Sequence, residues 1–308
     1  MNATESTYFV MQSLSEIPQR AAQAVKILRA THLGMCFGVR DAIDMALAQG
    51  RARPLTILGD LVHNETVLDS LRQNGIQIAS QPAEVATQAV MITAHGASDK
   101  AIGRARGQGL DVIEATCPLV RQAHRAIGQL AAEGYHPVII GKRDHVEVRG
   151  LSEDLEACDI ILTEEDVNNL TPRERFGVIA QTTQPTGKAR FLVELMRYRF
   201  PGAEVRFVDT ICRPTKQRQS AAIELAQKSD VVVVIGGNHS NNTRELMGTC
   251  SRFCRRVHHV QDAAGLRPEW FEGASVIGLT AGTSTPDSII DEVEQWLRKH
   301  TGYENRDI

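Results

Sequence analysis

Three cysteines occupy equivalent places in a repeated stretch of the sequence. Cys36, Cys117 and Cys212 each follow a short apolar run and a Thr-containing turn, and each precedes a segment with apolar positions at intervals of three and four residues. That spacing predicts an amphipathic helix behind each cysteine. A thiolate at the start of a helix is stabilised by unpaired backbone N–H groups and by the helix dipole. Three such thiolates that converge would make a metal site.

The other cysteines, Cys158, Cys250 and Cys254, have no counterparts in the repeat, and we expect them to be structural. For the repeated set, the alternative to a metal site is three small buried thiols at helix starts. Three thiolates could bind zinc, which has no redox chemistry, or a cubane iron–sulfur cluster with one iron left open to a substrate. The cysteines alone leave both metals possible.

The repeat continues beyond the helical segments. Each segment is followed by an apolar strand that ends in glycine, at Gly59, Gly141 and Gly236, and then by a polar loop. A later strand in each unit also ends in a polar loop. Self-similarity at this period indicates one unit used three times. The alternation of strands and helices predicts mainly parallel sheets.

The predicted fold is therefore α/β, with three pseudo-symmetric βα modules and mainly parallel sheets. The modules span residues 26–109, 110–201 and 202–297, between an N-terminal extension at 1–25 and a C-terminal tail at 298–308. Ligands of open α/β sheets bind beyond the carboxyl ends of the strands. Modules packed around a pseudo-threefold axis would bring the cysteines and the polar loops to one central cavity.

The polar loops are rich in hydrogen-bonding side chains, which suits a small anion such as phosphate. A single Ser or Thr of this kind is usually a turn or helix cap, and a single His is usually structural, but equivalent positions in three loops favour a common site. The residues are His63, Asn64, His95, His145, Glu147, Thr182, Thr183, Ser240, Asn241, Asn242, Thr243, Ser284 and Thr285.

Glu147 is the only carboxylate in this set. A carboxylic acid beside a bound substrate can act as a general acid. The alternative is an exposed Glu147 that pairs with the nearby Arg143 or Arg149. Because its loop aligns with the other two polar loops, we favour the general acid.

The overall composition excludes several classes of protein. The chain has 34 Lys and Arg against 37 Asp and Glu, a net charge of -3, so no basic footprint for nucleic acid is expected. The longest apolar run, 231–235, is far shorter than the roughly 20 residues that cross a bilayer. The first 20 residues lack the pattern of a secretory signal, so we expect a cytosolic protein without a membrane partner.

Nine motifs now identify a resemblance that runs from about Lys26 to Trp296. The sequence resembles the LytB family of 4-hydroxy-3-methylbut-2-enyl diphosphate reductases. The motifs are GMCFGV, LVHNETV, TAHGAS, EATCPLV, HVEV, AQTTQ, DTIC, SNNT and TAGTSTPD.

The resemblance implies a three-lobed α/β fold around a central [4Fe–4S] cluster that Cys36, Cys117 and Cys212 hold. It implies reductive removal of a hydroxyl from an allylic diphosphate to give isopentenyl and dimethylallyl diphosphates, the last step of the non-mevalonate isoprenoid pathway, with ferredoxin or flavodoxin as electron donor. By the same resemblance, the diphosphate is bound by His63, His95, Ser240, Asn242 and Ser284 with Asn241 adjoining, and the proton is handled by His145, Glu147 and Thr182.

Some positions depart from the usual pattern of that family. Val146 and Arg149 replace Pro and Glu in the His-Pro-Glu-Val-Glu motif, and Asn241 replaces the middle serine of Ser-Ser-Asn. Arg213 and Pro214 follow the third cysteine in place of Tyr-Ala. We expect these changes to affect loop geometry and rate more than the type of reaction.

Two other functions fit three convergent cysteines. Quinolinate synthase also places three modules around a three-cysteine cluster, although the nine motifs do not indicate it. An iron–sulfur sensor could hold the same cluster without turnover, but a sensor that binds DNA should show a basic reading element, which is not found in the sequence.

Overall fold

Short apolar runs form the central strands of three sheets. In the computed structural model, which describes residues 25–301, every residue of β10 (Val231–Ile235) is buried, and so is every residue of β4 (Ala89–Ile92). Strands that are buried on both faces suit the middle of a parallel sheet. Within the described residues, all paired strands are parallel. The predicted three α/β units with parallel sheets are confirmed.

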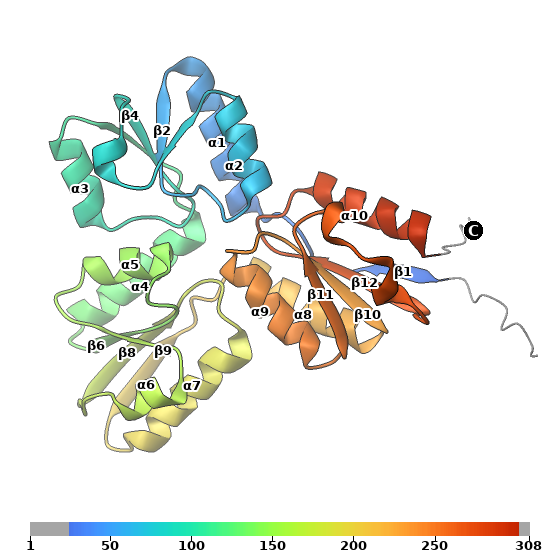
Figure 1. Ribbon diagram of the computed structural model, residues 1–308. Coiled ribbons are helices and arrows are strands. Elements are labelled where there is room, and N and C mark those ends of the chain that lie inside the picture. The colour runs from blue at the N-terminus through green and yellow to red at the C-terminus, as the bar shows by residue number, and fades with distance from the viewer. Residues whose placement is uncertain (1–24, 302–308) are drawn as a thin grey trace, which may run out of the picture.

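The three sheets share one strand order and define three lobes (Figure 1). Lobe 1 has the order β3-β2-β4-β5, lobe 2 the order β7-β6-β8-β9, and lobe 3 the order β11-β10-β12-β1. The remaining strands are β1 (Lys26–Arg29), β2 (Leu55–Leu58), β3 (Gln77–Ala79), β5 (Asp111–Glu114), β6 (His136–Ile140), β7 (Asp159–Ile161), β8 (Arg175–Ala180), β9 (Glu204–Val208), β11 (Arg256–Val260) and β12 (Val276–Ala281).

Each repeated cysteine stands at the start of a helix, as the spacing predicts. Cys36, Cys117 and Cys212 are the N-cap residues of α1 (Phe37–Ala52), α4 (Pro118–Ala132) and α8 (Arg213–Gln227). None of the three side chains makes a capping hydrogen bond. The other helices are α2 (Glu65–Gln73), α3 (Asp99–Gly107), α5 (Val146–Glu153), α6 (Glu164–Asn168), α7 (Thr186–Arg199), α9 (Asn241–Ser251) and α10 (Asp287–His300).

The chain passes from one lobe to the next at each of these cysteines. β5 pairs in lobe 1, whereas α4 behind Cys117 packs on β6 and β8 of lobe 2. β9 pairs in lobe 2, and α8 behind Cys212 packs on β10 and β12 of lobe 3. β1 pairs in lobe 3, and α1 behind Cys36 packs on β2 of lobe 1. Each cysteine is therefore attached to two lobes.

The sheets are offset by one strand from the repeat in the sequence. The predicted modules begin at residues 26, 110 and 202, at or just before the starts of β1, β5 and β9. β5 and β9 each pair in the sheet of the preceding lobe, and β1 pairs in the sheet of lobe 3. The repeat shows the order of the elements along the chain. The sheet to which a strand belongs depends instead on its pairing with residues distant in sequence. The division of the chain into modules with these bounds stays a prediction.

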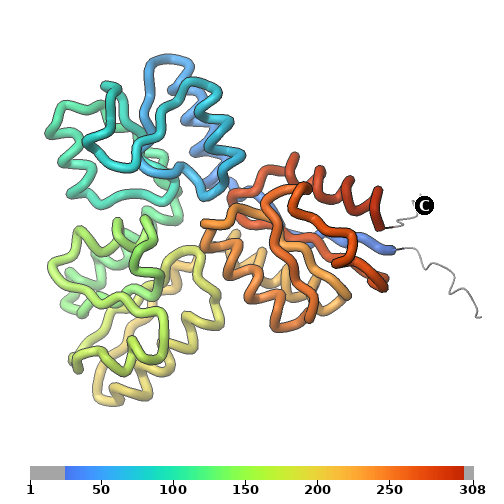
Figure 2. Tube along the Cα trace, in the orientation of Figure 1, coloured from blue at the N-terminus to red at the C-terminus, as the bar shows by residue number. Residues whose placement is uncertain are grey.

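Both ends of the described chain lie in lobe 3. β1 hydrogen-bonds along β12, so the start of the chain runs through the lobe that its end builds (Figure 2). α10 continues to His300, so the predicted tail at 298–308 begins inside this helix. Within α10, the Glu294 side chain forms an ion pair with Arg298, one turn later. The rest of the predicted tail, 302–308, and residues 1–24 of the predicted extension lie outside the described residues. Among residues 25–301, no helix combines the length and apolarity needed to cross a membrane.

Lobes 1 and 3 meet at the loops that follow β2 and β10. Gly237 lies so close to His63 that a Cβ atom at Gly237 would overlap the His63 carbonyl oxygen. The same two lobes are joined by the Cys36 N–H, which donates to the Thr283 carbonyl oxygen at 3.1 Å. Glycine at position 237 is therefore a condition for this close approach.

Replacing Gly237 with alanine should separate these loops, because the His63 carbonyl is a backbone group that cannot rotate away. We expect Gly237→Ala to lower stability by about 1–3 kcal/mol, the usual effect of overpacking, and to lower the thermal unfolding midpoint by a few degrees. Gly248→Ala in α9 is the matched control, since nothing lies within 4 Å of its added Cβ atom. Equal midpoints for the two variants would contradict the close approach.

Candidate functional site

Loops from all three lobes line one pocket. Lobe 1 contributes the loops after β2 and β4, lobe 2 those after β6 and β8, and lobe 3 those after β10 and β12. The structure thus brings together most of the polar residues that the sequence indicates. The pocket is lined by Val39, Val62, His63, His95, His145, Thr183, Ser240, Asn241, Asn242, Thr283 and Ser284.

The first polar loop of each lobe ends in a helix N-cap. The Asn64 side chain accepts from the Val67 N–H at 3.3 Å at the start of α2, and the Ser240 hydroxyl accepts from the Thr243 N–H at 3.2 Å at the start of α9. His145 caps α5 in the same way, because its Nδ1 accepts from the Glu147 N–H at 3.2 Å. Helix N-termini carry free N–H groups and positive dipole ends, which bind anions.

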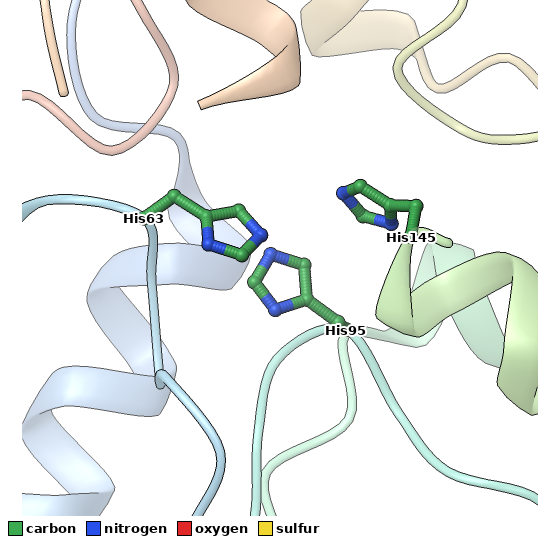
Figure 3. Close-up of side chains that lie close together, drawn as sticks. All are labelled: His63, His95 and His145. Atoms are coloured by element: carbon green, nitrogen blue, oxygen red, sulfur yellow. The ribbon is translucent and has the colours of Figure 1, made fainter. Parts of the chain in front are cut away.

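Three histidine rings form the wall of the pocket that lobes 1 and 2 supply (Figure 3). The ring centroids of His63 and His95 lie 4.7 Å apart and the rings are stacked. His145 meets both rings edge-on, with centroid distances of 5.5 Å. The three side chains are partly buried. They come from three separate loops, so their contact depends on how the two lobes pack.

Burial keeps two of these rings uncharged. It lowers the pKa of His145 to about 3, with a further contribution from the neighbouring His63. Burial, together with the other two rings, holds the pKa of His95 well below its usual value. The Nδ1 atom of His95 has no hydrogen-bond partner within residues 25–301. These two imidazoles are therefore neutral, and a bound anion would favour their protonation.

Glu147 and Thr182 bind each other behind His145. Glu147 is 1% exposed, and its two carboxylate oxygens accept from the Thr182 N–H at 2.7 Å and from the Thr182 hydroxyl at 2.9 Å. Burial raises the pKa of Glu147 to about 7, although both hydrogen bonds from Thr182 lower it. The alternative of an exposed Glu147 paired with Arg143 or Arg149 does not fit this burial. The carboxyl group can hold or release a proton near neutral pH.

Lobe 3 supplies the amide and hydroxyl side chains. Asn242 accepts from the Thr283 N–H at 2.9 Å, which ties the loop after β10 to the loop after β12. The Ser284 hydroxyl donates to the His63 carbonyl oxygen at 3.5 Å, across to lobe 1. The amide nitrogen of Asn241 is buried and has no partner in the described part of the chain. Asn241 is therefore free to donate to a bound ligand.

The three repeated cysteines lie close to one another and to Glu147. Burial raises the pKa of the Cys212 thiol to about 11, and Cys36 and Glu147 raise it further. Burial likewise raises the pKa of Cys117, with smaller contributions from Cys36 and Glu147. All three are free thiols. Thiolates would repel one another here, so a cation that compensates their charge fits this site.

Close neighbours restrict the positions of the thiols. Gly38 is the second residue of α1, and a Cβ atom there would overlap the Cys117 sulfur. The Thr215 hydroxyl lies 3.0 Å from the Cys212 sulfur. Of the other cysteines, Cys250 and Cys254 are buried beside backbone carbonyls of lobe 3, as expected of structural residues.

The sequence analysis did not single out Arg218, a buried cation beside the cysteines. Its guanidinium donates twice to the Gly34 carbonyl oxygen, at 2.6 and 2.9 Å, and Cys36 and Cys212 raise its pKa against the larger lowering by burial. Arg218 lies on α8, 7% exposed. A basic residue two turns from Cys212 on a buried helix face was the available signal.

Comparison with known proteins identifies the family. The profile of the LytB protein family matches residues 27–298, nearly all of the described chain. The chain belongs to the LytB family. A relative from Anaeromyxobacter sp. (strain Fw109-5), named 4-hydroxy-3-methylbut-2-enyl diphosphate reductase, is 38% identical over 278 residues, which cover 89% of this chain and 96% of the relative. A relative from Aquifex aeolicus with the same name is 36% identical, with the same coverage.

Solved structures of LytB reductases have the same fold. One, described as (E)-4-hydroxy-3-methyl-but-2-enyl diphosphate reductase, the terminal enzyme of the non-mevalonate pathway, is 35% identical with a TM-score of 0.65 and covers 89% of this chain and 99% of its own. The Plasmodium falciparum E-1-hydroxy-2-methyl-but-2-enyl-4-diphosphate reductase is 25% identical with a TM-score of 0.85 and covers 91% and 90%. These matches support the three-lobed LytB fold.

The departures from the usual LytB motifs fall around the pocket and the cysteines. Val146 and Arg149 lie in α5, and the Arg149 side chain is exposed. Arg213 and Pro214 form the first turn of α8 behind Cys212. Asn241 is the departure that lines the pocket itself. None of these replaces a cysteine, a histidine of the pocket or Glu147.

The raised pKa of Glu147 predicts a pH-dependent stability. The folded chain holds the proton more tightly than an ordinary glutamate of pKa 4.5, so the stabilising contribution is full below about pH 4.5 and is lost as the pH rises through about 7. The loss amounts to about 3 kcal/mol. Glu147→Gln keeps no titrating group, so from pH 5 to pH 8 it should gain up to this amount relative to the parent in anaerobic urea unfolding.

The exposed Glu156 provides the control for this measurement. Glu156→Gln should leave the difference in stability between pH 5 and pH 8 as in the parent, because an exposed carboxylate keeps its water. If Glu147→Gln and the parent lost stability in parallel over this range, Glu147 would not carry the proton.

Proposed function

We propose that this chain reduces 4-hydroxy-3-methylbut-2-enyl diphosphate to isopentenyl and dimethylallyl diphosphates, with a [4Fe–4S] cluster held by Cys36, Cys117 and Cys212. One observation carries the proposal: a buried carboxyl with a pKa of about 7 lies beside three converging thiols, next to a pocket of anion-binding groups from all three lobes. The names of the LytB relatives support the same reaction.

The diphosphate is assigned to the polar pocket. His63 and His95 donate from lobe 1, and Ser240, Asn242 and Ser284 donate from lobe 3, with the unpaired amide of Asn241 adjoining. His95 is uncharged in the empty pocket because its pKa is depressed. An anion beside the ring raises that pKa again, so the charge-assisted hydrogen bond forms together with the uptake of a proton.

The proton for the leaving hydroxyl is assigned to Glu147. The reaction breaks the C–O bond and takes two electrons and two protons. One proton leaves with the hydroxyl as water, and the other forms a new C–H bond. That bond forms at the carbon that carried the hydroxyl for dimethylallyl diphosphate, or at the far carbon of the double bond, which shifts, for isopentenyl diphosphate. Glu147 holds a proton near neutral pH and is close to Cys117 and Cys212. Thr182, bound to both carboxylate oxygens, fixes the orientation of the acid, and His145, which accepts from the Glu147 N–H, lines the pocket.

The cysteines fit the proposed cofactor. They stand at the three crossings between lobes and influence one another electrostatically, and glycine at position 38 allows α1 to approach the Cys117 sulfur. Thiolates are the usual ligands of iron–sulfur clusters, and a low count of three leaves one iron open. Such a cluster would supply electrons and a Lewis-acidic iron for the substrate hydroxyl.

The cysteine ligands can be tested by iron analysis. Cys36→Ser, Cys117→Ser or Cys212→Ser should each remove most of the iron and acid-labile sulfide from anaerobically purified protein, because a serine oxygen is a poor ligand for a soft iron site. The half-buried Cys158 is the control, and Cys158→Ser should keep both. Stoichiometric zinc without iron in the parent would remove the redox function altogether.

The family match favours the reductase over a quinolinate-synthase-like enzyme, and an assay separates it from a non-catalytic sensor. We further propose ferredoxin or flavodoxin as the electron donor, by resemblance to the family. We propose the cytosol as the compartment, since the other three cysteines, Cys158, Cys250 and Cys254, are free thiols, as a reducing compartment would keep them.

The proposed reaction is tested anaerobically with a reduced electron donor and 4-hydroxy-3-methylbut-2-enyl diphosphate, with both products quantified. Turnover to isopentenyl and dimethylallyl diphosphates is the expected result. A protein with its full complement of iron that binds the substrate and forms neither product would be a sensor.

Glu147→Gln tests the acid in the same assay. Glutamine keeps the size and the hydrogen bond from the Thr182 N–H but cannot release a proton. Iron content and substrate binding should persist while turnover falls about 100-fold or more, the usual effect of removing a general acid. Parental turnover in this variant would assign the proton to another group, such as the diphosphate of the substrate.

A further inference from the structure

The three histidines of the pocket also make a metal-binding donor set. One ligand atom from each of His63, His95 and His145 lies within 4.8 Å of the other two, and within residues 25–301 no other group of three His, Cys, Asp or Glu side chains is as close. Figure 3 shows the rings reaching from separate loops, with a nitrogen of each ring facing a common space. Imidazole nitrogens are preferred ligands of zinc.

The nitrogens that face this space are largely free of other bonds. His63 Nδ1 lies on the side of Asp60, 3.9 Å from its Oδ2 atom, so the Nε2 atom of His63 is available. His145 Nδ1 accepts the long bond from the Glu147 N–H, so His145 Nε2 becomes available once the ring proton moves to Nδ1. His95 has no partner on its buried Nδ1 atom within the described chain. None of the three rings is therefore held by a strong hydrogen bond that a metal would have to break.

The chemistry of the surroundings suits a metal cation. Metals bind the neutral form of imidazole, and burial keeps His95 and His145 in that form. The His63 ring lowers the pKa of the Asp60 carboxyl, which therefore stays ionised beside it. A carboxylate behind a histidine ligand is a common second partner in zinc sites, where it raises the basicity of the ring.

We propose that His63, His95 and His145 bind one Zn²⁺ ion when the pocket is empty, and that the bound ion excludes a diphosphate. Three histidines with a fourth position left open are a known zinc donor set. Zinc–nitrogen bonds of about 2.0–2.1 Å place the ligand atoms of a tetrahedral site about 3.3 Å apart, so the rings need to approach by small rotations. His145 gives up its cap bond as its proton moves to Nδ1.

Zinc and diphosphate compete because they need different forms of the same rings. A nitrogen that coordinates zinc through its lone pair has no N–H to donate to a phosphate oxygen. Zinc binding to the histidines does not rest on the proposed function, whereas the competition with substrate does. The experiments below test the two separately.

Zinc binding is tested on anaerobically purified protein with its iron in place. Zinc sulfate is added with a chelator that fixes the free zinc concentration, and zinc and iron are counted per chain after gel filtration. One zinc per chain with unchanged iron is expected, and absorption at the zinc K-edge should show imidazole nitrogen at about 2.0–2.1 Å without sulfur at about 2.3 Å. No retained zinc, a sulfur shell, or loss of iron would overturn the proposal.

Variants locate the ion. His63→Gln and His95→Gln should each weaken zinc binding about 10-fold or more, because each removes one of three ligands. The exposed His32 in the loop after β1 is the matched control, and His32→Gln should bind zinc as the parent does. Iron content shows whether each variant has kept its fold. Parental zinc affinity in either pocket variant with its full iron content would rule out the histidine site.

Competition is measured in the reductase assay at fixed free zinc. Zinc should raise the apparent KM for the diphosphate substrate without lowering kcat, and a chelator should reverse the effect. Inhibition that saturating substrate does not relieve would overturn the exclusion. If the chain showed no turnover at all, the proposed function would fail while the zinc counts and the absorption spectrum still decided the metal site.

Discussion

Each cysteine of the central site stands where the chain crosses between two lobes, and the rest of the site depends on this arrangement. The strand before the cysteine pairs in one sheet, and the helix behind it packs on the next. Cys36, Cys117 and Cys212 can therefore converge only when three sheets are in place together. The polar loops follow the two central strands of the same sheets. The packing of the three sheets that brings the thiols together therefore also assembles the pocket.

Burial sets the chemistry of these groups more than any single pair of charges. The same loss of water makes His145 harder to protonate and Glu147 harder to ionise, so the base becomes neutral and the acid keeps its proton. Unpaired polar atoms remain at His95 and Asn241. Buried groups without partners destabilise a fold, and these two line the pocket, where a ligand can satisfy them.

Local features of the fold and of the site were predictable from the sequence. The helices behind the three cysteines and the polar loops at strand ends follow from spacing and residue type, which act over a few neighbours. The pairing of β5 and β9 with the preceding lobe, and of β1 with lobe 3, was not predictable, because it depends on distant residues. The position of the Arg218 guanidinium beside the thiols was not predictable either. It depends on the packing of α8 against the loop that contains Gly34.

The place of β1 at the edge of lobe 3 has a consequence for how the protein is made. A chain leaves the ribosome from its N-terminus, so β1 emerges long before β12, its only paired strand among the described residues, which begins at Val276. The sheets of lobes 1 and 2 can form during translation, while the segment that leads to Cys36 still lacks its anchor. The three cysteines therefore come together only when nearly the whole chain has been synthesised, because a nascent chain that lacks β12 cannot anchor the segment that leads to Cys36.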